Sequence, residues 1–313
     1  MSDGNAQISG PVEIGDALTL RDETGRMVIE VGLRATLYFK SGHLPERRRG
    51  VAACFEEFFG MAGAGLRWVI PKQLRPKDSS MEQAAAALIA DLSSEDFDED
   101  DTWEFIWHGG EDIDSASDLM IQGFGCQAFK NKPSFLSVVF PLTFFAARPF
   151  GLPTLLARWA GHLTAFHGYG GIGLSYSPDH FISSRYGSQI IGFGMRFPGL
   201  ELDYPIPHAI WCREGIKGGN WLTVLSTELV DKLGGVEQLA ATLGEPFVFT
   251  EYSGGVLIRA GSVPELGDRN RQIDTPNYAR LAKALKPIRI RIHGPAIGIN
   301  NDKFEAWLAR FDE

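Results

Sequence analysis

Residues 168–173 read Gly-Tyr-Gly-Gly-Ile-Gly, the G-x-G-x-x-G spacing with which dinucleotide-binding proteins hold a pyrophosphate. That chemistry needs a strand before the glycines and a helix after them, because the helix N-terminus must meet the phosphates. Here a helix predicted from Pro153 precedes the glycines, and a predicted strand, 172–176, follows them. We therefore interpret the glycines as a helix end and a tight turn, and we expect no nucleotide site.

Other residues that could carry chemistry do not fall into a recognised pattern. His162 and His167 share the predicted helix, but at five residues apart they face different directions, unlike the i, i+4 pair of a zinc helix. The three cysteines, at 54, 126 and 212, are too far apart for a zinc site, and their odd number indicates a reducing compartment. We expect no cofactor and no metal. A site assembled from distant His, Asp and Cys residues stays open, because such groups meet only in the folded protein.

The strongest electrostatic feature is an acidic segment. Between Glu95 and Phe129 the chain carries eleven Asp or Glu residues and no Lys or Arg. The rest of the chain has 28 acids and 30 bases, so the net charge of −9 comes from this segment. It is either a solvated surface or a docking surface for a basic partner. A calcium loop is not indicated, because the loop glycine and the final glutamate are missing.

Within this segment we predict a partner-binding site formed by seven acids. They are Asp96, Asp98, Glu99, Asp100, Asp101, Glu111 and Asp112. Aromatic residues stand among them at 97, 103, 105 and 107. These aromatics could serve as buried anchors inside a charged rim, but we favour a position in the core of a strand.

The 313 residues have the composition of an ordinary globular protein, with 44% hydrophobic and 22% charged residues. The excess of acidic residues argues against nonspecific binding of nucleic acid, because the phosphate backbone repels a protein with a negative net charge. No apolar stretch of the kind found in a signal peptide lies near the start, and the most apolar stretch, 135–147, is too short to span a bilayer and contains Pro141. We therefore expect a cytoplasmic protein.

Strands and helices mix without the βαβα alternation of a doubly wound sheet, which predicts an α+β fold with mostly antiparallel strands and helices packed on one face. We expect residues 1–26 to form a flexible arm and residues 27–313 to form a single α+β domain. Pro198, Pro205 and Pro207 mark an internal boundary near 198–207 that could separate two lobes. The predicted strands are 33–39, 66–70, 103–107, 119–124, 135–140, 172–176, 190–197, 206–212, 221–225, 247–252, 256–260 and 288–292. The predicted helices include 45–59, 153–166 and one that ends near Leu92, with a capping box formed by Ser79 and Glu82.

Several motifs in the last third of the chain resemble the type VI secretion system immunity protein family. They are Gly219-Asn220-Trp221-Leu222-Thr223, Leu233-Gly234-Gly235, the strand that leads into Ala260-Gly261 and Pro264-Glu265-Leu266-Gly267-Asp268, and Tyr278 before Leu285-Lys286-Pro287. The strand at 33–39 and the run His167–Gly171 are similar too, so the resemblance covers about residues 30 to 293. These apolar and glycine-turn motifs indicate the fold rather than a site.

The resemblance implies a protein without catalytic activity that binds and neutralises a cognate secreted antibacterial toxin, in some cases a nuclease. Its partner would be that toxin protein, encoded by an adjacent gene, with no direct contact to nucleic acid or membrane. Inhibition would be stoichiometric occlusion, with the seven acids facing the basic cleft of the toxin. Two alternatives stay open: an enzyme with a site assembled from scattered residues, and a scaffold protein of the secretion apparatus.

Overall fold

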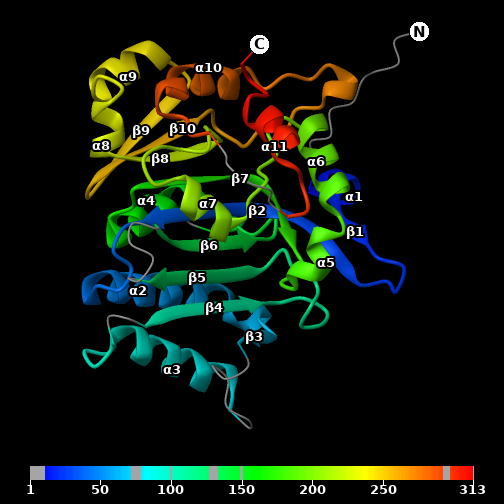
Figure 1. The fold of residues 1–313 in the computed structure, drawn as a ribbon, viewed down its shortest axis with the longest axis vertical. Helices are drawn as coiled ribbons and strands as arrows, with labels where there is room; N and C mark the ends of the chain where they lie inside the picture. Colours follow the sequence, from blue (N-terminus) through cyan, green and yellow to red (C-terminus); the bar gives the residue numbers. More distant parts are fainter. Residues whose placement is uncertain are drawn as a thin grey trace.

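A single antiparallel sheet organises the protein (Figure 1). The computed structural model describes residues 11–71, 79–98, 101–126, 133–148, 151–291 and 297–312. Its ten strands follow the order β3-β4-β5-β6-β2-β7-β8-β10-β9, and β1 pairs with β2 beside this path. Their bounds are β1 Leu20–Arg21, β2 Met27–Phe39, β3 Trp68–Ile70, β4 Thr102–His108, β5 Met120–Cys126, β6 Ser134–Phe140, β7 His167–Tyr176, β8 Leu222–Ser226, β9 Phe247–Tyr252 and β10 Gly255–Ala260.

Helices cover both faces of the central strands. On one face, Leu156 of α4 lies against Ala35 of β2 and the backbone of Gly170 in β7. On the other face, Ala209 of α7 packs with Tyr38 and Tyr169 of the same two strands. The helices are α1 Pro11–Leu18, α2 Pro45–Ala62, α3 Met81–Ser93, α4 Leu152–Leu163, α5 His180–Ser184, α6 Gly187–Arg196, α7 Pro205–Trp211, α8 Thr227–Asp231, α9 Val236–Leu243, α10 Pro276–Leu285 and α11 Asn301–Leu308. The α+β class and the antiparallel sheet are confirmed, whereas the prediction of helices on one face only is wrong.

The aromatic residues of β4 belong to the core. Trp103, Phe105 and Trp107 are buried on one face of the strand, and Phe55 of α2 meets Phe105 and Trp107 edge-on at ring distances of 5.5 and 5.0 Å. α2 begins with Pro45 in its first turn, which suits the fixed φ of proline. This confirms the core interpretation for these three aromatics, and it fixes which face of β4 points outward. Phe97 precedes the strand and is only half-buried.

Two segments predicted as strands are helices. In α6 the buried residues are Gly187, Ile190, Ile191 and Gly194, and in α7 they include Pro205, His208 and Ala209. These steps of three and four residues are the helical period, which a short apolar run does not separate from a buried strand. Residues 288–291 form no named strand either: a 3₁₀ turn, Lys286–Ile288, ends there, and Arg289 makes an isolated bridge to Ile216. Residue 292 lies outside the described residues.

Smaller differences concern the first helix and one cap. α1 buries Ile14 and Leu18, and β1 pairs with β2, so residues 11–21 pack onto the fold where the sequence suggests an arm. Residues 1–10 lie outside the described part. The capping box of α3 is formed by Ser80 and Gln83, one residue later than predicted. The predicted boundary at 198–207 does not interrupt the sheet, because β7 pairs directly with β8.

Candidate functional site

The predicted acidic site is divided by strand β4. Asp96 and Asp98 precede the strand, Asp101 adjoins its start, and Glu111 and Asp112 follow its end. The strand has seven residues, so the two groups are separated by about 20 Å at ~3.3 Å per residue. Glu99 and Asp100 lie outside the described residues. The described acids therefore form two surfaces at opposite ends of β4 rather than one.

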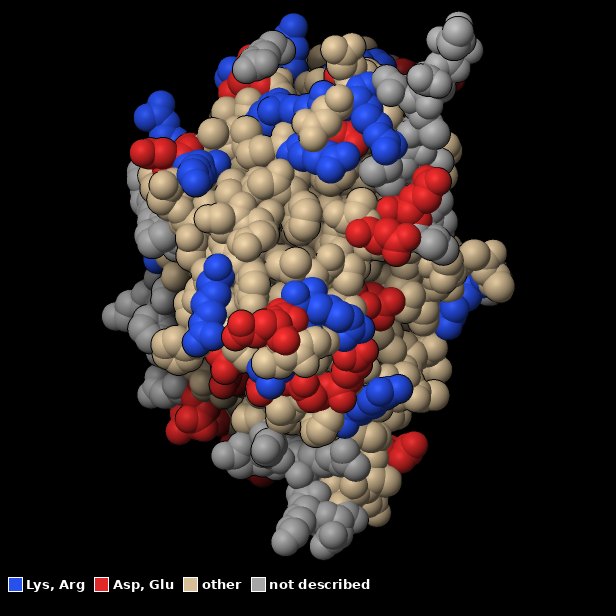
Figure 2. Space-filling view, turned by 90° about the vertical axis from the view of Figure 1, so that its right-hand side faces the viewer, with Lys and Arg blue, Asp and Glu red and all other residues tan. Residues whose placement is uncertain are grey.

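The acids that follow β4 are matched by arginines. The carboxylate of Glu111 accepts two hydrogen bonds from Arg21, both at 2.8 Å, and Asp112 lies 3.3 Å from Nε of Arg26. Both arginines belong to the β1–β2 hairpin. Figure 2 views the side of the molecule on which this hairpin projects, and it shows acidic and basic side chains interleaved there. This surface is therefore mixed in charge and not an acidic patch.

The acids before and at the start of β4 are exposed. Asp96, Asp98, Asp101 and Glu104 are all exposed, and within the described ranges no cation forms an ion pair with Asp96, Asp101 or Glu104. Glu95 pairs with Arg49 at 2.9 Å. We refer to Asp96, Asp98, Asp101 and Glu104 as the acidic edge. Among the described acids of the predicted site, Asp96 and Asp101 are therefore not matched by a cation, in contrast to Glu111 and Asp112.

A second candidate site, which the sequence analysis did not predict, is a cluster of charged and polar side chains buried between the sheet and α7. At its centre the carboxylate of Asp203, which is fully buried, accepts hydrogen bonds from Arg34 at 3.0 Å, Thr36 at 2.7 Å and Tyr38 at 3.3 Å. Tyr169 also donates to it, and Nδ1 of His208 lies 2.9 Å away. One carboxylate thus joins β2, β7 and α7.

Lys217 links this carboxylate to a second one. Its Nζ donates to Glu201 and, at 3.1 Å, to the carbonyl of Leu202, and it lies 3.5 Å from Asp203. Asn220 donates to the other oxygen of Glu201 at 2.8 Å. The negative charges of Asp203 and Glu201 therefore balance the positive charges of Arg34 and Lys217 inside the protein. We call Arg34, Asp203, Glu201, His208 and Lys217 the buried charge network.

Burial and charge shift the protonation of the network strongly. Desolvation alone would raise the pKa of Asp203, but the charges of Arg34 and Lys217 and its hydrogen bonds hold it well below the ordinary value. Burial lowers the pKa of His208 to about 4. It also raises the pKa of the Cys212 thiol to about 12, so that thiol is not a nucleophile near neutral pH.

The glycines of residues 168–173 lie within strand β7 and do not form a turn. The preceding helix ends at Thr164, which takes the left-handed conformation at φ 44°. A Cβ on Gly171 would lie 2.2 Å from Oδ1 of Asn220, and one on Gly173 would lie 2.8 Å from Cβ of Arg34. The interpretation as a helix cap is therefore wrong. Gly171 and Gly173 make room for the buried charge network.

We expect Gly171→Ala to destabilise the protein by about 1–3 kcal/mol, because the added methyl displaces Asn220 from its bond to Glu201. Gly192→Ala is the matched control: no heavy atom lies within 4 Å of its Cβ position in helix α6, so alanine should stabilise the protein by roughly 0.5–1 kcal/mol. Urea denaturation measures both. Equal effects of the two substitutions would contradict the role assigned to Gly171.

A hollow of about 180 Å³ lies beside the buried charge network. Its lining comes from β4, β5 and the end of β7, and from α5, α7 and the segment before α7. Arg34 and Asp203 reach its wall, together with the buried side chain of Tyr176. The hollow is large enough for a side chain or a few waters.

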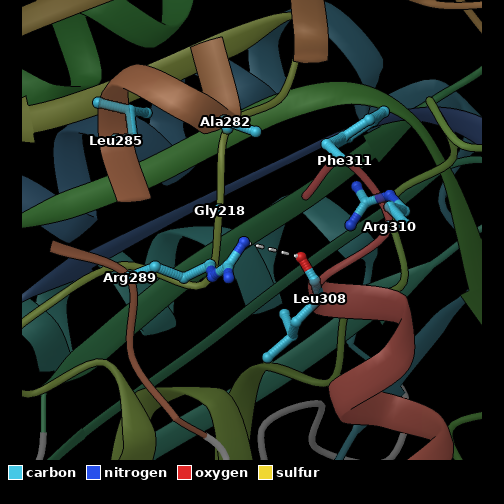
Figure 3. A pocket seen from close by; sticks show the side chains of 8 residues that line it. Gly218, Ala282, Leu285, Arg289, Leu308, Arg310 and Phe311 are labelled. Atoms are coloured by element: carbon cyan, nitrogen blue, oxygen red, sulfur yellow. Dashed lines mark hydrogen bonds between the residues drawn. The ribbon is translucent and has the colours of Figure 1, made fainter. Parts of the chain in front are cut away.

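A second hollow, between α10 and α11, is too small for a ligand. It holds about 10 Å³, close to a single water, and Arg289 donates across it to the carbonyl of Leu308 at 3.4 Å (Figure 3). Arg310 and Phe311 complete its wall. In the described ranges no group of three or more His, Cys, Asp or Glu residues could hold a metal ion, and no helix is long and apolar enough to cross a membrane.

The sequence did carry a signal for the buried charge network. In β2, Arg34, Thr36 and Tyr38 alternate with Leu33, Ala35 and Leu37, which indicates a strand with one polar face. A polar face of a strand is usually solvated. Here β2 lies at the centre of the sheet and α7 covers that face, so the same residues are buried.

Comparisons with known proteins agree with the predicted resemblance. Residues 50–311 match the family TsiV, described as type VI immunity for VRR-NUC. Among solved structures, the Pseudomonas aeruginosa T6SS protein PA0821 is similar with a TM-score of 0.80 and 26% sequence identity, over 94% of this chain and 87% of that chain. No curated protein matches. Since the family match spans well over half of the 313 residues, the chain belongs to the TsiV family of type VI immunity proteins.

Proposed function

We propose that this protein binds a cognate VRR-NUC toxin and neutralises it by stoichiometric occlusion, without catalysing a reaction. The observation that carries the proposal is the family match over residues 50–311, which includes the acidic edge, the lining of the hollow apart from Arg34, and all strands except β1 and β2. We further propose that the toxin is a nuclease encoded by an adjacent gene, and that the two proteins meet in the cytoplasm.

Electrostatics supports this function. A nuclease must attract phosphate groups, so its substrate-binding surface is basic and would be attracted to an acidic inhibitor. We propose that all seven predicted acids contribute to this attraction, Asp96, Asp98, Glu99, Asp100 and Asp101 more than Glu111 and Asp112. The reason is that Glu111 and Asp112 already pair with Arg21 and Arg26.

The primary test is co-expression of the toxin with this protein. We expect growth to be rescued and the two proteins to co-purify at a fixed ratio. Co-expression with a variant lacking a folded core, such as one deleted in β2, provides the control. Loss of rescue by wild-type protein, or its capture by components of the secretion apparatus and not by the toxin, would contradict the proposal.

Charge reversal at the acidic edge should slow association. Asp96→Lys, Asp98→Lys and Asp101→Lys together should lower the association rate constant about tenfold or more at low salt and weaken its salt dependence, because steering depends on these charges. Stopped-flow binding at several salt concentrations measures both.

The matched control makes the same charge change at the opposite edge of the sheet, with Asp231→Lys, Glu237→Lys and Glu251→Lys. All three acids are exposed, on α8, α9 and β9. If the two triple variants slow association equally, net charge decides the rate and the acidic edge has no special role.

One observation favours an enzyme instead: Arg34 and Asp203, with shifted protonation, line a hollow. A titration separates the two functions. An occluding protein leaves nuclease activity in proportion to the uncomplexed toxin, whereas an enzyme inactivates a molar excess of toxin over time. Complete inactivation by about a tenth of an equivalent would favour the enzyme.

A further inference from the structure

The outward face of the β4–β5 pair is not covered by a helix of the described chain. α2 lies behind these strands, and α7 lies in front of β6 and β7 (Figure 1). Residues of β4 that point away from the core are therefore open: Thr102 and Glu104 are exposed, and Ile106 is half-buried. In the register, Phe124 lies opposite Glu104 and Gln122 lies opposite Ile106, and both are half-buried. We call these residues of β4 and β5 the open face.

The open face leads into the hollow and to exposed apolar side chains. Ile106 and Gln122 line the hollow from the sheet, while Tyr204 and Ile206 line it from the side of α7. Four large hydrophobic side chains are exposed among the described residues, and two of them stand here: Ile206 at 55% and Phe181, which follows the lining residue His180, at 78%. Exposed apolar side chains around a concave surface are typical of a protein interface.

Charge indicates which kind of partner fits this surface. Glu104 belongs to the open face itself, and Asp101 adjoins the same end of β4. The hollow, which Ile106, Met120 and Ile206 line in part, therefore has the acidic side chain of Glu104 beside it. A basic partner that presents an apolar side chain would complement both, with the apolar contact desolvated and the charges at the rim.

We infer that the toxin docks across the open face, and that an apolar side chain from the basic surface of the toxin enters the hollow between β4–β5 and α5–α7. This inference rests on the proposed function and adds the place of contact. The side chain of Tyr176 lines the same hollow. The acidic edge then guides encounter, and the hollow holds the complex.

The test is a pair of double substitutions. Phe181→Asp with Ile206→Asp should raise the Kd for the toxin about 30-fold or more, as expected for the loss of an interface hot spot. Val248→Asp with Val263→Asp is the matched control, because these are the other two exposed hydrophobic side chains and they belong to β9 and the loop after β10. Isothermal titration with catalytically inactive toxin measures the Kd, and thermal unfolding verifies that each variant is folded.

Each outcome decides something. If wild-type protein binds the toxin and both double variants bind equally well, or equally poorly, the toxin does not dock over the hollow beside the open face and this inference is overturned, while the proposed function stands. If the wild-type protein does not bind, the proposed function is overturned and this inference with it. If Phe181→Asp with Ile206→Asp unfolds the protein, the milder pair Phe181→Ala with Ile206→Ala must still weaken binding relative to Val248→Ala with Val263→Ala.

Discussion

Replacing Asp203 by Ala should destabilise the protein by about 3–5 kcal/mol, because it leaves Arg34 and Lys217 buried without their shared counter-ion. Thr36, Tyr38 and Tyr169 lose their acceptor at the same time. Urea denaturation followed by circular dichroism measures the free energy of unfolding. This is the largest effect that we expect from a single substitution.

Asp231→Ala on α8 is the control for that experiment, since Asp231 is exposed and its removal should change stability by less than about 0.5 kcal/mol. Asp203→Asn keeps the size of the side chain while removing the charge, and should also destabilise strongly. A loss below about 1 kcal/mol for Asp203→Ala would show that the buried charge network does not hold the sheet and α7 together.

Lowering the pH from 7 to about 4.5 should cost roughly 3–5 kcal/mol of stability. Burial lowers the pKa of His108 and His208 to about 4 and that of His167 to about 3. In the unfolded chain histidine takes up a proton near pH 6.5. Between about pH 6.5 and 4 the unfolded state therefore binds more protons than the folded state, and the free energy of unfolding decreases as the pH is lowered. Glu30 acts in the opposite direction, because burial and Asp118 raise its pKa to about 7, and it offsets roughly one of the three histidines.

His167→Asn tests this pH dependence, because the asparagine amide can still donate to the carbonyl of Val224, which lies 3.0 Å from Nδ1 of His167. The slope of stability against pH should fall by about 1.4 kcal/mol per unit between pH 4 and 6.5 and stay unchanged above pH 7. Denaturant unfolding across that range measures the slope. The lowered pKa of Asp203 acts separately, since its contribution is present above about pH 4 and is lost only at lower pH. An identical slope for wild type and variant would contradict the assignment to His167.

Elements with a clear period were predictable from the sequence. In β4 the apolar residues recur at every second position, and in α4 they recur at every third or fourth position. Both patterns are long enough to define one apolar face of the element. The segments predicted as strands at 190–197 and 206–212, which lie almost entirely in α6 and α7, have only eight and seven residues. At that length the apolar pattern of a helix face cannot be told from that of a buried strand. Only the packing of these helices decides between the two structures.

The candidate sites also differ in how far the sequence alone could predict them. That Asp96, Asp98 and Asp101 lie on the surface follows from local charge density, which no folded core tolerates. That Arg21 and Arg26 match Glu111 and Asp112 depends on a contact between segments about 90 residues apart, which no local pattern contains. The same is true of Asp203, because its partners come from β2, β7, α7 and Lys217.

The central place of β2 also bears on how the protein is made. Tyr38 pairs with His167, about 130 residues further along the chain. At a synthesis rate of about 5–20 residues per second, the growing chain holds β2 with an open edge for roughly 6–26 s before β7 emerges. During that time the edge is open to aggregation, and closing such a distant pairing is slow. The central pairing of the sheet is therefore completed late in synthesis, well after β2 itself has been made.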